Sequence, residues 1–285
     1  MFAIIFLMQT LNEIKKEYSK KIDHLDLDLI IAHVIKKPRE FVLTHPEYTP
    51  TGAQIGKIRS FIHRRAKHEP LAYILGYKEF YGLTFKVTPD TLIPRPETEL
   101  LVEEVLKLKL KNKNIFDVGT GSGNIIISLA KNISTKNNFI GIDISVETLK
   151  IAKQNAKANQ VSEKIKFIHG NLLDKIKNLD NSIIIANLPY LSKEIYNTTA
   201  PNVKKYEPKS ALYSPKEGLA HYRKLLQQVA ILRSTMRDAR CAIFLEISPE
   251  QKTKLPKIIK TYLPKAKIEF QKDLAKKWRI CKITI

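Results

Sequence analysis

The tetrapeptide Asn187-Leu188-Pro189-Tyr190 follows the apolar residues 183–186 and carries the most specific chemistry in the chain. A nitrogen conjugated to a carbonyl or an aromatic ring is a poor nucleophile, because its lone pair is delocalised. Two acceptors that hold both of its N–H bonds leave the lone pair aimed at an electrophile. The Asn187 side-chain oxygen and the Leu188 backbone carbonyl can be those acceptors, since Pro189 keeps Leu188 extended and Tyr190 can stack on a planar group. Taken alone, these residues are equally typical of an Asn–Pro turn.

A glycine loop lies earlier in the chain, between the apolar residues 115–118 and a helical pattern. It consists of Gly119, Thr120, Gly121, Ser122 and Gly123. Glycines let the backbone approach a ligand closely, and the amide groups of a helix N-terminus then face that ligand. The loop predicts a nucleotide-type cofactor, although Asn124 stands where a dinucleotide-binding loop would have its third glycine. A tight strand–helix turn is the alternative for the loop alone.

Three further positions extend this cofactor site. Asp143 lies about 20 residues after the loop, where a carboxylate can accept hydrogen bonds from two ribose hydroxyls, although it could equally cap a helix. Leu172 follows the apolar residues 165–168, and residues 170–172 are expected to flank an adenine because ligands sit beyond the carboxyl ends of strands. Asp117 could lie near a positive amino group of the cofactor. S-adenosyl-L-methionine fits this chemistry: its methyl sits on a sulfonium, so placement supplies much of the catalysis and no metal is required.

The elements that position these residues alternate along the chain. Apolar runs at residues 115–118, 139–144, 165–168, 183–186 and 242–247 predict strands, with helices expected at residues 124–131, 145–159, 219–237 and 249–262. Nearly continuous apolar strands separated by helices predict a mainly parallel sheet that is covered on both faces. The tail, residues 267–270 and 279–285, has the pattern of a closing β-hairpin. The predicted fold is therefore an α/β, Rossmann-like methyltransferase domain.

The residues before this domain have a different pattern. Residues 9–75 read as helices, with Asp23, Asp26 and Asp28 as candidate N-caps and with an apolar stripe that includes Ile55 and Ile62. Residues 76–98 alternate short apolar runs with glycine and proline, which predicts a β-hairpin linker. We therefore expect a small helical domain at residues 1–78, followed by the hairpin and the methyltransferase domain at residues 79–285.

Composition limits the partners. The net charge of +21 favours proximity to nucleic acid or the ribosome, although lysines spread widely along the chain give the same value. No apolar run is long enough to cross a membrane, and residues 1–8 lack the basic lead and cleavage site of a signal peptide. Cys241 and Cys281 are expected to be free, buried thiols. We expect a cytoplasmic monomer without a metal site or membrane partner.

The chain also resembles a known family, the HemK/PrmC glutamine methyltransferases of peptide chain release factors, over nearly its whole length. The most specific matches are the stretches EPLAYILG at residues 69–76, EFYG at residues 79–82 and TLIPRPETE at residues 91–99. The GTGSG and NLPY motifs match as well. One departure is Leu188, where the family usually has proline. We expect activity to survive with a less rigid loop, because the proposed chemistry needs only the backbone carbonyl of Leu188.

The resemblance implies methylation of a glutamine side-chain amide in class-1 release factors. It implies that the five glycine-loop residues, Asp143, Leu172 and Asn187 contact S-adenosyl-L-methionine, and that residues 187–190 hold the glutamine. The helical N-terminal domain then looks like the module that docks the release factor. Leu172 stands where some members have an aromatic residue, which would weaken stacking on the adenine.

Two other functions compete with this interpretation. An RNA or DNA adenine methyltransferase would use the same nitrogen chemistry and would suit the basic charge, but such enzymes do not resemble the N-terminal helices or the stretch at residues 69–99. A ribosome-associated binding module on a retained methyltransferase fold is the second alternative. Such a module would have lost its enzymatic activity. The intact glycine loop, Asp143 and Asn187 argue against this alternative.

Overall fold

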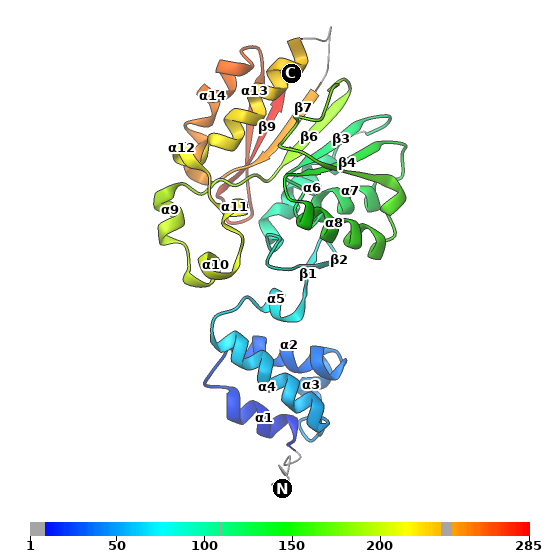
Figure 1. Cartoon of the computed structure of the whole chain (residues 1–285), viewed down its shortest axis with the longest axis vertical. Helices are drawn as coiled ribbons and strands as arrows, with labels where there is room; N and C mark the ends of the chain where they lie inside the picture. Colours follow the sequence, from blue (N-terminus) through cyan, green and yellow to red (C-terminus); the bar gives the residue numbers. More distant parts are fainter. Residues whose placement is uncertain (1–8, 109, 235–240) are drawn as a thin grey trace. The chain divides into compact units, whose positions relative to one another are not determined.

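The computed structural model describes residues 9–108, 110–234 and 241–285 (Figure 1). The chain forms two compact units, Met1–Gly76 and Tyr77–Ile285, whereas the sequence places the expected boundary after residue 78. Residues 1–8 and residues 235–237, the end of one expected helix, lie outside the described part. Within the described part, no helix is both long enough and apolar enough to cross a membrane.

The first unit is built from short helices. They are α1 (Leu11–Tyr18), α2 (His24–Ile35), α3 (Arg39–Thr44), α4 (Gly52–Ala66) and α5 (Leu71–Leu75). Of the three candidate caps, Asp23 caps α2, and its side chain accepts hydrogen bonds from the first turn. The prediction for Asp26 and Asp28 was wrong, because both lie inside α2 and form ion pairs instead, Asp26 with Arg65 and Asp28 with Lys15.

The apolar stripe of α4 forms much of the core of this unit. Ile55, Ile58 and Ile62 are buried there together with the apolar residues of α2. A buried stripe at helical spacing is what an amphipathic helix needs to pack on its neighbours, so the prediction is confirmed.

The second unit begins with the predicted hairpin, in which β1 (Tyr77–Phe80) pairs with β2 (Leu83–Lys86) in an antiparallel arrangement. Phe80 and Phe85 are buried, with their ring centroids 6.1 Å apart, and join one core cluster of the unit. A 3₁₀ helix, η1 (Pro96–Thr98), and α6 (Glu99–Leu106) follow the hairpin. The hairpin is therefore anchored to this unit by its aromatic side chains.

A seven-stranded sheet forms the centre of the second unit (Figure 1). Its order is β5-β4-β3-β6-β7-β9-β8. The strands are β3 (Asn114–Val118), β4 (Asn138–Asp143), β5 (Ile165–His169), β6 (Ser182–Ala186), β7 (Cys241–Glu246), β8 (Lys267–Lys272) and β9 (Trp278–Thr284). Strands β3 to β7 are parallel to one another, whereas β9 runs antiparallel to both β7 and β8. The predicted mainly parallel sheet with a C-terminal hairpin is confirmed.

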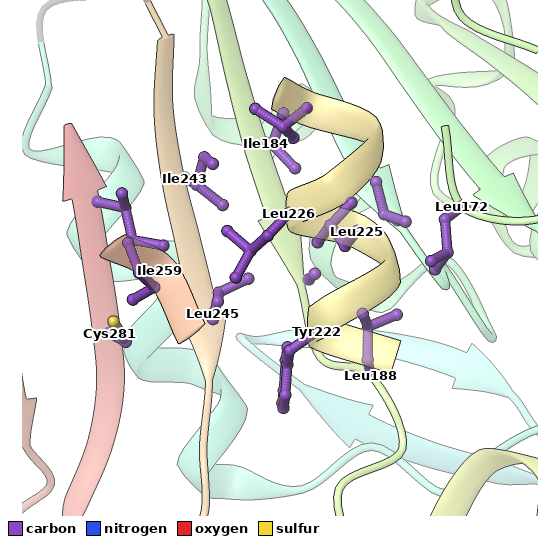
Figure 2. Close-up of a cluster of buried hydrophobic side chains, with 14 of the residues drawn as sticks. Leu172, Ile184, Leu188, Tyr222, Leu225, Leu226, Ile243, Leu245, Ile259 and Cys281 are labelled. Atoms are coloured by element: carbon purple, nitrogen blue, oxygen red, sulfur yellow. The ribbon is translucent and has the colours of Figure 1, made fainter. Parts of the chain in front are cut away.

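Helices cover both faces of this sheet, as nearly continuous apolar strands require. One face carries α6, α7 (Asn124–Asn132) and α8 (Val146–Ala158), and the other carries α13 (Ala220–Ser234) and α14 (Leu255–Tyr262). Figure 2 shows Leu225 and Leu226 of α13 over Ile184 and Ile243 of the sheet. Cys281 lies in the same cluster, and both it and Cys241 are buried free thiols, as predicted.

Residues 193–218 form four short helices that the sequence did not reveal. They are α9 (Lys193–Thr198), α10 (Pro201–Tyr206), α11 (Lys209–Leu212) and α12 (Pro215–Gly218). Prolines interrupt this segment, so no run is long enough to show a helical period. Gly218 ends it with φ +78°, and a Cβ atom there would lie 2.0 Å from the Tyr190 carbonyl oxygen. The segment therefore returns to the tetrapeptide through a contact that only glycine allows.

Candidate active site

A cavity of about 440 Å³ lies at the carboxyl ends of the parallel strands. Ligands of open α/β sheets bind there, where the strand order reverses, and in this sheet the reversal falls between β3 and β6. The volume lies within the range of small-molecule sites, which is about 300–1,000 Å³. Of the predicted site residues, the structure brings together in its wall Gly119, Thr120, Gly121, Ser122, Asp143, Leu172, Asn187, Leu188 and Pro189.

The glycine loop forms a sharp turn between β3 and α7. Gly119 and Thr120 both donate their backbone N–H groups to the Ile142 carbonyl, at 2.8 and 2.9 Å, which ties the loop to β4. Gly123 does not line the cavity; it begins α7 with φ +82°, and a Cβ atom there would lie 2.8 Å from the Ile127 Cδ1 atom. Both conformation and space therefore require glycine at that position.

Asp143 ends β4, and its carboxylate faces the glycine loop. Its Oδ2 atom accepts a hydrogen bond from the Gly121 N–H and its Oδ1 atom one from the Ser145 N–H, each at 3.0 Å. Burial raises the pKa of Asp143 above its ordinary value, and these two hydrogen bonds act in the opposite direction. A carboxylate has about four acceptor sites. Asp143 can therefore hold the loop and still accept hydrogen bonds from a ligand.

Asp117 lies beneath the glycine loop and is fully buried. Its Oδ2 atom accepts hydrogen bonds from the Thr120 hydroxyl at 2.7 Å and from the Ile126 N–H at 3.3 Å. Burial raises the pKa of Asp117 to about 7. Asp117 is not among the described residues that line the cavity and its carboxyl braces the loop, so its expected position near a cofactor amino group stays a prediction.

Leu172 contributes an apolar edge to the cavity from the loop after β5. It has φ +60° and belongs to the same core cluster as Leu188 (Figure 2). The loop is fixed from α13, since Gln228 accepts a hydrogen bond from the Leu173 N–H at 2.9 Å and donates to the Asn171 carbonyl at 3.2 Å. The Leu172 edge of the cavity is therefore held in place by contacts within the protein.

Asn187 follows β6 directly and reaches the cavity with its side chain. Its Nδ2 atom donates to the Thr98 hydroxyl oxygen at 3.1 Å. Because this bond uses the NH₂ group, the side-chain oxygen is the atom that remains to accept a hydrogen bond. The Leu188 side chain points into the core and would lie 3.1 Å from a Cβ atom on Gly119. The two motifs therefore meet at one wall.

Tyr190 is not among the described residues that line the cavity. Its ring packs against the core, and burial, reinforced by the charge of Glu246, raises the pKa of its phenol well above the ordinary value. Its carbonyl accepts a hydrogen bond from Gln251 at 3.4 Å. Tyr190 thus gives the tetrapeptide a rigid end, and stacking of its ring on a ligand stays a prediction.

Several side chains at the cavity were missed by sequence reasoning. Arg95 forms an ion pair with the buried Glu207 at 2.5 Å, and Glu207 also accepts the Ile93 N–H at 3.3 Å. This pairing fixes the segment of residues 193–218 to the stretch that carries Ile93 and Arg95, of which Arg95 lines the cavity. Arg95 lies in a stretch that carries the family resemblance, but the resemblance gave it no role.

His221, at the start of α13, lines the cavity, although the sequence analysis did not single it out as a site residue. Its Nδ1 atom lies 2.8 Å from the Ser214 hydroxyl, and its ring also forms a hydrogen bond with the Pro189 backbone. Burial, followed by the charge of Lys224, lowers the pKa of His221. A neutral imidazole therefore helps to hold the tetrapeptide in place. A single histidine without ligand spacing gave no signal for this role.

Known protein families match both parts of the chain. A family described as a methyltransferase domain matches residues 109–259, and a family described as the PrmC N-terminal domain matches residues 9–76. The first match contains the glycine loop and the tetrapeptide. The second covers the described helices of the first unit.

Curated relatives and a solved structure show the same likeness. The release factor glutamine methyltransferase of Dictyoglomus turgidum is 36% identical over 277 residues, covering 96% of this chain and 95% of that protein. Its counterpart from Enterococcus faecalis is 40% identical over 207 residues, or 72% of each chain. The hMettl16 catalytic domain, solved with a MAT2A 3′UTR hairpin, has a TM-score of 0.55 over 89% of this chain and 91% of that one. Its identity of 14% limits that likeness to the fold.

Proposed function

The chain belongs to the family of release factor glutamine methyltransferases, and we propose that it methylates the side-chain amide nitrogen of a glutamine in class-1 peptide chain release factors. The observation that carries this proposal is the position of the Asn187 amide. It lies on the wall of the same cavity as the glycine loop and Asp143, and its NH₂ group is already bonded to Thr98. An acceptor for a planar amide thus lies beside a site for a nucleotide-type cofactor.

S-adenosyl-L-methionine, the cofactor of this methyltransferase family, supplies an electrophilic methyl group on a sulfonium. The cavity fits it in size and in donor chemistry. Asp143 provides a carboxylate for the ribose hydroxyls, Leu172 provides an apolar edge for the adenine, and Gly119–Gly121 of the glycine loop line the cavity. Ser122 and Gly123 complete the turn that holds this backbone.

The tetrapeptide would prepare the nucleophile. The Asn187 side-chain oxygen and the Leu188 carbonyl accept the two N–H bonds of the glutamine amide, so that its nitrogen lone pair points toward the methyl donor. Pro189 restricts Leu188, and His221 and Gln251 hold the following backbone. Positioned acceptors of this kind act mainly in the transition state, because they favour the localised lone pair of the reacting amide.

The helical unit Met1–Gly76 is proposed to dock the release factor. A flexible glutamine loop needs a second, distant contact if its amide is to spend appreciable time in the cavity. The match of residues 9–76 to a PrmC N-terminal domain supports this role. We further propose a cytoplasmic monomer, and the charge of +21 permits but does not require proximity to the ribosome.

Parallel labelling tests the proposed function. The full-length chain is incubated with methyl-labelled S-adenosylmethionine and either a class-1 release factor or ribosomal RNA, and the label is located by mass spectrometry. We expect the label on a glutamine side chain of the release factor. Label on RNA adenines would favour the competing nucleic-acid activity. Absence of label from both, together with no cofactor binding in calorimetry, would favour the binding module.

A truncation tests the docking role separately. A chain without residues 1–76 keeps the cavity and both core clusters of the second unit. We expect it to bind S-adenosylmethionine normally and to methylate intact release factor far more slowly. A short glutamine peptide should be methylated equally poorly by both forms. Full-length rates on intact release factor would refute the docking role without affecting the methyltransferase assignment.

A further inference from the structure

The proposed chemistry requires a particular orientation of the Asn187 amide. Its oxygen and its NH₂ group have nearly the same shape, so rotation by a half-turn would present a donor to the glutamine in place of an acceptor. The polypeptide must therefore distinguish the two ends of this amide. The Asn187 backbone cannot do so, because both orientations leave it unchanged.

Thr98 supplies that distinction from a segment 89 residues earlier in the chain. Thr98 is 1% exposed, and its hydroxyl accepts a hydrogen bond from the Asn187 Nδ2 atom at 3.1 Å. A hydroxyl can either donate or accept, however, so Thr98 fixes the amide only if its own proton is directed elsewhere.

Glu246 is the group that takes this proton. It ends β7, and Asn187 follows β6 immediately; the preceding residues, Leu245 and Ala186, are register partners in the sheet. Glu246 is 1% exposed, its carboxyl lies close enough to the Thr98 hydroxyl for a side-chain hydrogen bond that lowers its pKa, and its Oε2 atom has no hydrogen-bond partner within the described residues. An ionised carboxylate can only accept, so the Thr98 proton points to Glu246 and the Thr98 lone pairs remain for Asn187.

We propose that Thr98 and Glu246 are positioning residues, which hold the Asn187 amide with its oxygen toward the substrate through the relay Glu246–Thr98–Asn187. This inference rests on the proposed function, because the amide orientation matters only if Asn187 accepts an N–H bond of the glutamine. It assigns a role to Thr98 and Glu246, which belong to neither the glycine loop nor the tetrapeptide.

The relay has a titratable end. Burial raises the pKa of Glu246 to about 7, while Thr98 and Arg279 lower it and Glu97 raises it. Arg95, Tyr190 and Tyr222 also face this carboxyl. Below this pH Glu246 becomes a donor and no longer fixes the Thr98 proton. Turnover should therefore fall as the pH drops through about 7, and Glu246→Gln, which keeps an acceptor oxygen without a titrating proton, should lose that dependence.

The central test compares three threonine variants in a release-factor assay at saturating cofactor. Thr98→Val keeps the shape of the side chain but removes the hydroxyl, and we expect kcat to fall between about tenfold and 100-fold because the acceptor is misplaced. Thr98→Ser restores the hydroxyl and should return kcat to within about threefold of wild type. Thr91→Val is the matched control: Thr91 is also 1% exposed, its hydroxyl donates to the Thr88 carbonyl, and it does not line the cavity. It should leave kcat unchanged.

Wild-type kcat in Thr98→Val would overturn the relay, and so would an unchanged acid limb of the pH profile in Glu246→Gln. The second result would assign that limb to another group, such as the buried Asp117. A readout independent of turnover is the pair of Asn187 side-chain amide resonances in ¹⁵N-labelled protein, which should shift in Thr98→Val and not in Thr91→Val. If wild-type protein leaves the release factor unlabelled, the proposed function fails, whereas unshifted resonances in Thr98→Val would refute the relay.

Discussion

Two walls of one cavity are built in different ways. The glycine-loop wall, here residues 119–123 with Asp143 and Ser145, is held through its backbone groups, which bond to Ile142 and Asp143 at 22 or 23 positions and to the Asn155 side chain at 33 positions along the chain. The Asn187 wall, here Asn187 and Leu188 with Thr98 and Glu246, depends on side chains whose partners come from distant segments. The first arrangement suits the binding of a constant cofactor. The second suits the orientation of a reacting group, because side-chain acceptors can be aimed.

This difference predicts that the walls act on different kinetic constants. Interactions that are equal in the ground state and the transition state change binding, whereas those made only in the transition state change turnover. Substitutions in the glycine-loop wall should raise the cofactor Kd, and those in the Asn187 wall should lower kcat.

The largest effect is expected for Asn187→Ala. Loss of one positioned hydrogen bond to a developing charge costs about 100-fold to 1,000-fold in kcat. The cofactor Kd should stay within about tenfold of wild type, since the Asn187 side chain acts on the nucleophile. Steady-state methylation of release factor gives kcat, and calorimetry gives Kd. Near-wild-type turnover in this variant would rule out the acceptor role.

Asp143→Ala should have the reverse signature. The variant removes charge-assisted hydrogen bonds to the ribose, so we expect the cofactor Kd to rise by about tenfold to 100-fold. At saturating S-adenosylmethionine, kcat should remain within a few-fold of wild type. Asp143→Asn keeps one acceptor oxygen and should show an intermediate Kd. Normal cofactor binding by Asp143→Ala would show that the glycine-loop wall does not determine the cofactor Kd in this way.

The two walls also differ in how far the sequence could predict them. The glycine loop and Asp143 are short motifs at the ends of apolar runs, and a parallel sheet brings the carboxyl ends of its strands to one edge. Local pattern was therefore enough to place both at the cavity. The same reasoning predicted strands β3 to β7, because buried strands leave nearly continuous apolar runs in the sequence, whereas β8 and β9 were predicted as a closing hairpin.

The Asn187 wall could be predicted only in part. Asn187 was recognised from its own tetrapeptide, but Thr98 and Glu246 were not, since nothing in a single buried threonine or glutamate names a partner 89 or 148 residues away. The helices of residues 193–218 were missed for a related reason. Each is too short to show a period, and Glu207 and Gly218 fix them through tertiary contacts.

Gly123→Ala tests the rigidity of the glycine-loop wall with a smaller effect. A Cβ atom would meet Ile127 at 2.8 Å, and φ +82° strains any residue with a side chain. We expect a loss of stability of about 1–3 kcal/mol and a several-fold rise in the cofactor Kd, with little change in kcat at saturation. Thermal melts and calorimetry measure both. A fall in kcat alone would show that the glycine loop also orients the reaction.

The smallest effect is expected for Leu188→Pro, which restores the residue that the family usually has. The carbonyl is kept, and proline favours the extended conformation already imposed by Pro189. The change does remove core packing, because Leu188 is 3% exposed and its side chain belongs to the core cluster drawn in Figure 2. We therefore expect kcat within about threefold of wild type and a loss of stability of about 1–2 kcal/mol.

Leu188→Ala separates the two contributions of this residue. It removes more of the buried side chain without adding backbone restriction, so it should lower the melting temperature further than Leu188→Pro while leaving the carbonyl in place. If Leu188 serves the reaction only through that carbonyl, kcat should be similar in both variants at a temperature where both are folded. A collapse of kcat in Leu188→Pro alone, with normal cofactor affinity, would show that the Leu188 N–H is needed. The Asn187 wall would then share the backbone chemistry of the glycine-loop wall, and the contrast between the two would narrow.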